Sequence, residues 1–577
     1  MALIGKWVFP PLTVLLLILA FWEPARRRVL AVREIERLEK RLTLSDKGYW
    51  LAFALILAVG VLVRCYRFVE LPLGQNPDGT MAGVEALCLA DGGTDQYGTS
   101  WPTYFAAWQF SQMSTLYSYL MIPFVKLLGL SKLTLRLPML LMSLIALPLM
   151  WDLARRIAGK AFALLALFLL ALNPWHLVLS RWALEANMLP HVLLLAVYLL
   201  MIGREKRWAL YLSMAVFGLA PYAYGLAAIS VPCLLLPAAI FLVGREKVKP
   251  LDVAVCVALF ALVSAPYYVT MALNALGLET MTLGPITMPL FAESKRAEDI
   301  AFSAANPYLQ MLQNFRGFLK MLTGAYAGEQ YCVVEWANTM YPFVVPAALF
   351  GWYKLCRDRR KLALSRSEAP LRDGGMLILI WMAASVINGA VVGTVVNRNN
   401  ILYYPLILCA AYTLWQMGRR LRVALAAMLT MIAVGFAGMC NVYFSDSYQQ
   451  ETGEGFAYGL QEALHEAWGW DCDRYYVTLD GHESNEMAMT ANVMFAHRID
   501  YAMRAEEEEL RGPDGEPNGW YYGERYIYQL FEDFEPDPTE CAAYIVSAEE
   551  TALFDEEDYI IERFGNFAAV YPRYWAE

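Results

Sequence analysis

Residues 71–98 read LPLGQNPDGTMAGVEALCLADGGTDQYG. This polar stretch directly follows an apolar run at residues 49–66, and among its four carboxylates Asp78, Glu85 and Asp95 are the functional candidates. Acidic side chains beside a bilayer are costly, and they are rare where no function requires them. An apolar span that ends in an acidic loop therefore predicts a membrane protein with a functional site at the membrane surface.

The chain repeats this apolar pattern as far as residue 440. Of its 577 residues, 58% are hydrophobic and only 18% are charged, whereas soluble domains carry about 25% charged residues. Apolar runs of helical length predict an α-helical polytopic membrane protein with about twelve transmembrane helices. The predicted spans are residues 7–21, 49–66, 133–153, 161–177, 186–202, 208–224, 227–243, 251–273, 340–355, 374–393, 400–417 and 423–440.

Positive charge predicts the orientation of these spans. By the positive-inside rule the basic clusters should all be cytoplasmic. This holds if the apolar stretch 116–130 lies in the plane of the membrane or re-enters it, instead of crossing. Both the N-terminus and the C-terminal region are then extracytoplasmic. The six basic clusters are residues 26–47, 155–160, 204–207, 245–249, 357–372 and 419–422.

Charge also divides the chain into parts. Residues 441–577 hold 31 acidic and 7 basic residues, a net charge of −24, while the remainder has a net charge of +15. This difference predicts two compartments. We expect an N-terminal anchor with a basic linker at 1–48, a transmembrane catalytic module at 49–440, and an acidic extracytoplasmic α/β domain at 441–577. The module has outer loops at 67–131 and 274–339.

The cysteines and motifs exclude several classes of chemistry. The ten cysteines show no metal-binding spacing, so no metal and no cofactor is expected. Cys472 and Cys541 could form a disulfide on an oxidising side, or remain two free thiols. The chain has no Walker loop, dinucleotide fingerprint, zincin motif or nucleophile elbow. It also lacks the basic, aromatic-rich surface of a nucleic-acid-binding protein.

The acidic loop offers candidates for catalysis and for substrate contacts. Asp78 could act as a general base, or it could simply be the turn residue of an Asp-Gly pair. Glu85 falls on the same helix face if a helix extends that far. Asp95 and Tyr97 lie in a glycine-bounded loop and could contact sugar or acceptor hydroxyls, although a turn explains Asp95 equally well.

Basic side chains near span ends form a second set of candidates. Arg136, Arg181 and Arg398 could bind a lipid phosphate through their guanidinium forks, or could reach to lipid headgroups. Arg181 could instead form an ion pair with Glu185 four residues later. The residues expected to support this site are His176, Glu185 and Asn397.

In their order along the chain these motifs resemble those of bacterial GT-C glycosyltransferases. The motifs are the acidic first loop, GTDQYG at 93–98, RLP at 136–138, NPWHLVLSRWALE at 173–185 and NRNN at 397–400. The resemblance covers about residues 51–440 and is strongest to the protein O-mannosyltransferase and lipid A aminoarabinose transferase group.

The resemblance implies a function and a catalytic residue. It implies transfer of a sugar from a polyprenyl-phosphate donor to an envelope glycan, lipid or protein on the outer side of the cell membrane, with inversion and without a metal. It maps the catalytic aspartate onto Asp78. Where the family commonly has Asp-Glu, this chain has Asp78-Gly79.

Two other interpretations compete with an enzyme. A transporter or flippase for a lipid-linked or polar solute would place charges in broken mid-membrane helices and would often show paired repeats. A non-catalytic protein would only present the acidic domain to partners. The acids of this chain lie in loops and its halves show no clear repeat, which favours the enzyme.

Overall fold

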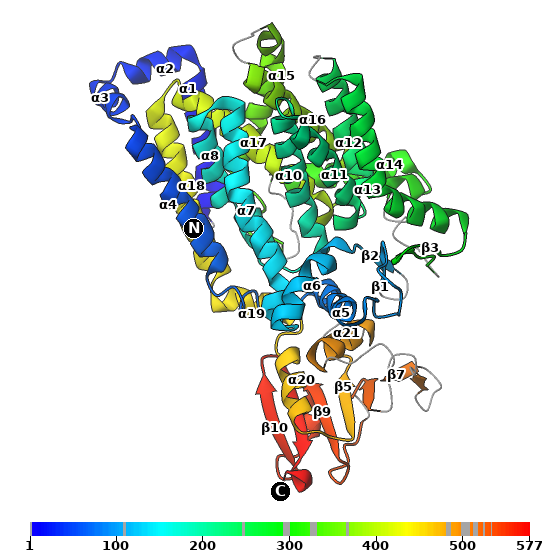
Figure 1. The fold of residues 1–577 in the computed structure, drawn as a ribbon. Coiled ribbons are helices and arrows are strands. Elements are labelled where there is room, and N and C mark those ends of the chain that lie inside the picture. Colours follow the sequence, from blue (N-terminus) through cyan, green and yellow to red (C-terminus); the bar gives the residue numbers. More distant parts are fainter. Residues whose placement is uncertain are drawn as a thin grey trace.

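The computed structural model describes residues 3–107, 111–244, 248–291, 300–323, 332–364, 369–480, 486–497, 508–511, 517–522, 525–531 and 534–576. Figure 1 shows a helical bundle with a smaller α/β domain at one end. The helices α5 (Pro77–Gly92) and α6 (Leu116–Leu128) lie between the two parts.

Each predicted span overlaps one helix of the bundle, and seven helical segments of the described chain are long and apolar enough to cross a membrane. The protein is therefore a multi-pass membrane protein, while the count of twelve spans stays a prediction. The overlapping helices are α1 (Phe9–Phe21), α4 (Asp46–Cys65), α7 (Lys132–Ala158), α8 (Lys160–Ala171), α10 (Met188–Gly203), α11 (Arg207–Ala223), α12 (Ala227–Val243), α13 (Pro250–Leu276), α15 (Val345–Leu364), α16 (Ala369–Val391), α17 (Tyr403–Gly418) and α18 (Arg422–Tyr443).

The two ends of the bundle differ in character. The basic linker forms α2 (Glu23–Leu30) and α3 (Arg33–Arg41), which lie at the end opposite the α/β domain (Figure 1). The basic linker and the α/β domain therefore lie at opposite ends of the bundle, while the orientation of the bundle in the membrane stays a prediction. The short apolar helix α6 packs on α5 and α7 near the α/β domain, so it does not run alongside the long helices.

Short elements connect the long helices at the end that faces the α/β domain. The corner after α8 contains α9 and η2, and the corner after α16 contains η5, so three of the predicted motifs lie in irregular connections. These elements are η1 (Ile4–Val8), α9 (Pro174–Leu179), η2 (Glu185–Asn187), η4 (Ala301–Ser303), α14 (Pro307–Thr323), η5 (Asn397–Leu402), and the hairpins β1 (Phe105–Ala107) with β2 (Ser111–Met113) and β3 (Met281–Leu283) with β4 (Ile286–Met288).

The C-terminal region confirms the α/β prediction. A seven-stranded sheet has the order β10-β11-β9-β5-β8-β7-β6, in which β5 pairs in parallel with β8 and β9 and the remaining pairs are antiparallel. Cys472 and Cys541 are both free. The elements are α19 (Asp446–Glu454), α20 (Leu460–Gly469), β5 (Arg474–Thr478), α21 (Glu486–His497), β6 (Glu508–Arg511), β7 (Pro517–Tyr522), β8 (Tyr526–Gln529), β9 (Ala542–Ser547), η7 (Glu550–Leu553), β10 (Tyr559–Phe564), β11 (Phe567–Pro572) and η8 (Arg573–Trp575).

Candidate active site

Asp78 lies in the first turn of α5, at the surface of the bundle. Asn76 caps this helix, because its side-chain oxygen accepts hydrogen bonds from the backbone N–H groups of Asp78 at 3.0 Å and Gly79 at 3.3 Å. Pro77 occupies the first helical position, where a missing N–H costs nothing. Asp78 is half-buried. The helix start therefore fixes where this carboxylate stands.

Close packing at Gly79 leaves no room for a second acid beside Asp78. A Cβ added at Gly79 would collide with the carbonyl oxygen and side chain of Ala183. Backbone therefore packs directly on backbone where α5 meets the segment after α9. A second acid at position 79 would require these two segments to move apart.

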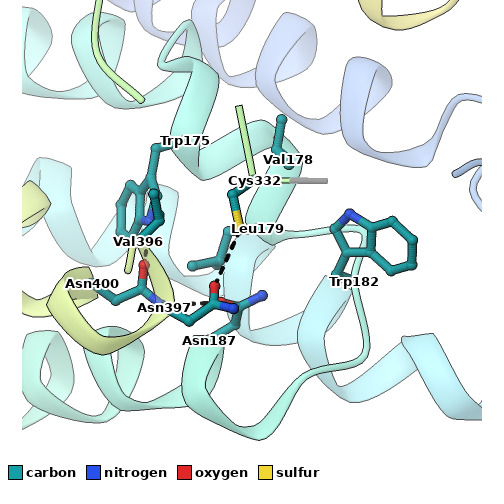
Figure 2. A pocket seen from close by; sticks show the side chains of 9 residues that line it. All are labelled: Trp175, Val178, Leu179, Trp182, Asn187, Cys332, Val396, Asn397 and Asn400. Carbon is teal, nitrogen blue, oxygen red and sulfur yellow. Dashed lines mark hydrogen bonds between the residues drawn. The ribbon is translucent and has the colours of Figure 1, made fainter. Parts of the chain in front are cut away.

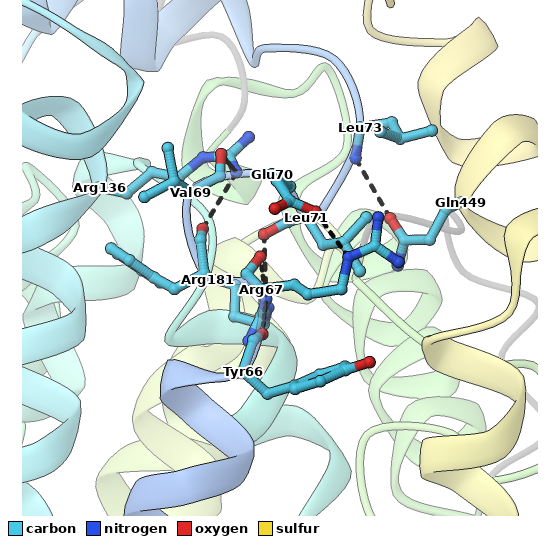
Figure 3. Close-up of polar contacts among 10 residues, drawn as sticks. Tyr66, Arg67, Val69, Glu70, Leu71, Leu73, Arg136, Arg181 and Gln449 are labelled. Carbon is cyan, nitrogen blue, oxygen red and sulfur yellow. Dashed lines mark hydrogen bonds and ion pairs between the residues drawn. The ribbon is translucent and has the colours of Figure 1, made fainter.

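Two buried arginines, which we call the arginine clamp, hold the loop between α4 and α5. The side chain of Arg181 donates hydrogen bonds to five main-chain carbonyls and that of Arg136 to four. Figure 3 shows the bonds to the carbonyls of Tyr66, Arg67, Val69 and Leu71. Both arginines are almost inaccessible, at 0% and 2% exposure. The carbonyls belong to Val63, Arg64, Tyr66, Arg67 and Leu71 for Arg181, and to Phe68, Val69, Pro72 and Gly74 for Arg136.

Arg136 and Arg181 therefore have a structural role. Arg181 bonds the last carbonyls of α4, which lack partners within the helix and carry the negative end of its dipole. Arg136 bonds the turn that leads to α5, and so both guanidinium groups position Asp78. Their predicted contact with a lipid phosphate stays a prediction.

The alternative ion pair between Arg181 and Glu185 is wrong. Among the described residues no salt bridge joins them, because the Arg181 guanidinium faces the α4 carbonyls. A carboxylate oxygen of Glu185 instead accepts a hydrogen bond from the backbone N–H of Ser114. Glu185 thus links η2 to the strand β2 segment of the first loop.

Glu85, Asp95 and Tyr97 gather at the other end of α5. Both carboxylate oxygens of Glu85 accept hydrogen bonds from Gln96, one from its backbone N–H at 3.0 Å and one from its side chain. Asp95 accepts backbone N–H bonds from Tyr97 at 3.0 Å and Thr99 at 2.7 Å, which is the pattern of a turn. Burial raises the pKa of Asp95 to about 6.

This second group lies apart from Asp78. Glu85 follows Asp78 by seven residues, which is about 10 Å along a helix. Its carboxylate is fully buried and is turned toward the loop that it stabilises. Of the three acids singled out in the first loop, Asp78 therefore lies at the candidate site, while Glu85 and Asp95 hold the loop that follows α5.

His176 belongs to a buried polar chain that begins at Arg64, a residue that the sequence did not single out. Nη2 of Arg64 lies 2.7 Å from Nδ1 of His176, whose Nε2 lies 3.1 Å from the hydroxyl of Tyr404. That hydroxyl lies 2.6 Å from Nδ1 of His191. Because a guanidinium can only donate, Nδ1 of His176 accepts and the imidazole is neutral. An arginine at the end of a span usually extends toward lipid headgroups, so nothing in the local sequence distinguishes Arg64 from such a residue.

Beside this chain a hollow opens between α9, η2 and η5 (Figure 2). It is shallow and open on one side, with room for about one water molecule. Indole and amide groups give it a neutral, hydrogen-bonding wall. It is lined by Trp175, Val178, Leu179, Trp182, Asn187, Cys332, Val396, Asn397 and Asn400.

Hydrogen bonds fix the amides of the hollow. The indole N–H of Trp175 donates to Oδ1 of Asn400 at 2.8 Å, and Nδ2 of Asn400 donates to Oδ1 of Asn187 at 3.0 Å. The thiol of Cys332 lies 3.5 Å from Oδ1 of Asn397. Arg398 directly follows Asn397 and is half-buried, with Nη1 near the backbone of Gly393. Asn397 and Arg398 thus reach the same corner as the hollow.

The hollow and Asp78 are connected through the Trp182–Ala183 segment. Trp182 lines the hollow and Ala183 supports the first turn of α5. The ring of Trp182 also packs on Phe456 of the C-terminal region, with 4.7 Å between ring centroids. The backbone of Phe456 accepts a hydrogen bond from the N–H of Gln75 at 2.9 Å. The C-terminal region therefore supports both sides of the candidate site.

No group of three or more metal-ligating side chains occurs in the part of the chain that the structure describes. The chemistry of the described site lies in one carboxylate, several arginines and a set of neutral amides and aromatic rings.

Comparison with known proteins gives the family of folds to which the bundle is similar. A family model described as dolichyl-phosphate-mannose-protein mannosyltransferase matches residues 113–269. ArnT from Cupriavidus metallidurans, solved with undecaprenyl phosphate, is similar with a TM-score of 0.53 at 13% identity, over 91% of this chain and 98% of that chain. The apo oligosaccharyltransferase of Archaeoglobus fulgidus gives a TM-score of 0.47 at 14% identity, over 78% and 64%. No curated protein sequence matches the chain.

The chain therefore has the GT-C fold of membrane glycosyltransferases. Its predicted resemblance to the group of protein mannosyltransferases and lipid A aminoarabinose transferases is confirmed.

Proposed function

We propose that this protein is a glycosyltransferase that moves a sugar from a polyprenyl-phosphate donor to an acceptor on the extracytoplasmic side of the membrane. The observation that carries the proposal is the position of Asp78. A half-buried carboxylate stands on a capped helix start between the bundle and the α/β domain, and two arginines hold the loop before it. A catalytic group must be held in a fixed position, and these contacts hold the Asp78 carboxylate in this way.

The proposed reaction is an inverting displacement. Asp78 takes the proton of an acceptor hydroxyl, whose oxygen attacks the anomeric carbon from the face opposite the phosphate. The bond from that carbon to the phosphate oxygen breaks, and the polyprenyl phosphate leaves as an anion. Phosphate is a good leaving group, and a guanidinium can stabilise its charge without a general acid.

Arg398 is the arginine that we assign to this phosphate. Arg136 and Arg181 direct their donors to main-chain carbonyls, whereas Arg398 is half-exposed at the corner of η5. Asn397, beside it, lines the hollow. The hollow has room for about one water molecule, so its indole and amide groups would bond a single hydroxyl of the donor sugar, whose ring lies outside it. His176 and Glu185 act as supports of this corner.

The loop residues Glu85, Asp95 and Tyr97 are the proposed contacts of the acceptor. Their loop lies in the same outer connection as Asp78 and could meet the acceptor as it enters. The acceptor is an envelope glycan, lipid or protein, and the C-terminal domain is extracytoplasmic with the site. No cofactor takes part.

The proposal is tested by transfer from a radiolabelled polyprenyl-phosphate sugar to membrane acceptors. The purified full-length protein should give a covalent glycan product, and Asp78→Asn should abolish it while donor binding persists. Asp91→Asn is the matched control, because Asp91 is an exposed acid on the same helix. Full activity of Asp78→Asn would remove Asp78 from its role, and movement of the donor without a covalent product would favour the transporter.

A further inference from the structure

Helix α14 has one face packed on the protein and one face of mixed character that the described chain leaves exposed. Its buried side chains are Asn314, Phe318, Met321 and Leu322. On the outer face Tyr308 is 85% exposed and Leu312 is 64% exposed. One face of α14 is therefore fixed to the protein, and the opposite face is accessible to solvent or lipid.

Contacts place α14 at the end of a membrane span. The side chain of Asn314 donates to the carbonyl of Ala390 at 3.3 Å, and the hydroxyl of Thr394 donates to the carbonyl of Asn314 at 3.1 Å. Gly317 packs so closely on Thr394 that a Cβ there would collide with its side chain. Ala390 belongs to the last turn of α16, one of the candidate spans. Helix α14 therefore packs at the end of this span, where the membrane boundary is expected.

The outer face of α14 is itself divided along the helix. Tyr308, Leu312 and Leu319 follow one another at spacings of four and seven residues, which forms an apolar stripe. Arg316 and Lys320, four residues apart and both exposed, lie on the adjacent stripe. Hydrocarbon would exclude the two charges, and water would disfavour the exposed leucines. Only the interface between them suits both stripes.

We infer that α14 lies in the membrane interface and binds the phosphate groups of anionic phospholipids through Arg316 and Lys320. Tyr308, Leu312 and Leu319 enter the acyl region, and the two cations remain at the depth of the headgroups. Charge complementarity selects anionic over zwitterionic lipid. The lipid layer is thereby fixed against the end of α16. It lies next to the loop that α14 supports through Thr394, four residues before Arg398.

One test is the depth of two neighbouring positions in nanodiscs. Nitroxide labels are placed at Leu312→Cys or Gln313→Cys in full-length protein whose exposed Cys65 and Cys356 are serine. The label at 312 should be reached by oxygen from the lipid, and the label at 313 by a water-soluble nickel chelate. Equal access of the chelate to both labels would overturn the interfacial position.

A second test measures the lipid itself. Full-length protein purified from mixtures of phosphatidylglycerol and phosphatidylcholine should retain phosphatidylglycerol in excess. The affinity should fall about fivefold for each charge removed in Arg316→Gln and Lys320→Gln, while Lys126→Gln on α6 leaves it unchanged. Retention unaffected by Arg316→Gln/Lys320→Gln would overturn the phosphate contact. Neither readout depends on glycosyl transfer, so both stand apart from the proposed function.

Discussion

At the scale of single residues, Gly79 shows how backbone contact limits the chemistry of the site. The first turn of α5 rests on the Ala183 carbonyl, with no room for a side chain between them. The position after Asp78 therefore has no room for a second acid. One base is sufficient when the leaving group is a phosphate that needs no proton.

Gly79→Ala should consequently lower both stability and transfer. The added methyl group forces α5 away from Ala183, at a cost of about 1–3 kcal/mol, and displaces Asp78. Gly92→Ala at the other end of the same helix is the control, because a Cβ there would lie at an ordinary 3.5 Å from Thr94. The measurements are the thermal midpoint and the rate of sugar transfer; equal effects of the two substitutions would contradict this packing.

Asp95 predicts a pH dependence of stability. Burial raises its pKa from 3.8 to about 6 in the folded protein, so the folded state binds the proton more tightly than the unfolded state does. The stability from this residue is present at low pH and declines as the pH rises from about 4 to 6. The thermal midpoint of Asp95→Asn should lack this decline; an identical pH profile for both proteins would contradict the assignment.

At the scale of elements, the loop between α4 and α5 is ordered by charge rather than by regular structure. Nine carbonyl acceptors on that segment meet two guanidinium groups, one from α7 and one from the corner after α9. Lysine has a single ammonium with three donors and cannot reproduce this fork. The shape of arginine is therefore as important as its charge.

Arg181→Lys should loosen this loop although the charge is kept. Unsatisfied carbonyls should lower stability by about 2–4 kcal/mol, and transfer should fall because Asp78 loses its support. Arg155→Lys is the control, because Arg155 is exposed and its ion pair with Asp152 survives the exchange. Thermal unfolding in detergent and the transfer assay provide the measurements. An Arg181→Lys protein with normal stability and activity would show that the clamp does not matter.

At the scale of the whole molecule, the membrane bundle and the C-terminal domain share the candidate site. α21 packs on α5, where Phe495 lies against Gly83, and Phe456 supports both Gln75 and Trp182. An ion pair joins Lys132, at the start of α7, to Glu462 of α20. The acidic domain is therefore part of the scaffold of Asp78.

Hydrophobic periodicity and charge clusters predicted the bundle and the α/β domain correctly, because both follow from local sequence. The site was harder to predict. Arg136 and Arg181 resemble phosphate ligands in sequence, but their partners are carbonyls more than 60 residues away. Such contacts leave no local pattern. Arg64 and Phe456 were missed for the same reason, since only the folded chain brings them to His176 and Trp182.

The most direct measurement is a structure of the full-length protein with a polyprenyl-phosphate sugar bound. A phosphate oxygen should accept hydrogen bonds from Arg398, a hydroxyl of the sugar should reach the hollow beside Trp175 and Asn397, and the anomeric carbon should face Asp78. Arg136 and Arg181 should keep their carbonyl partners. A phosphate bound away from Arg398, or a donor on the face of the membrane opposite Asp78, would contradict this account.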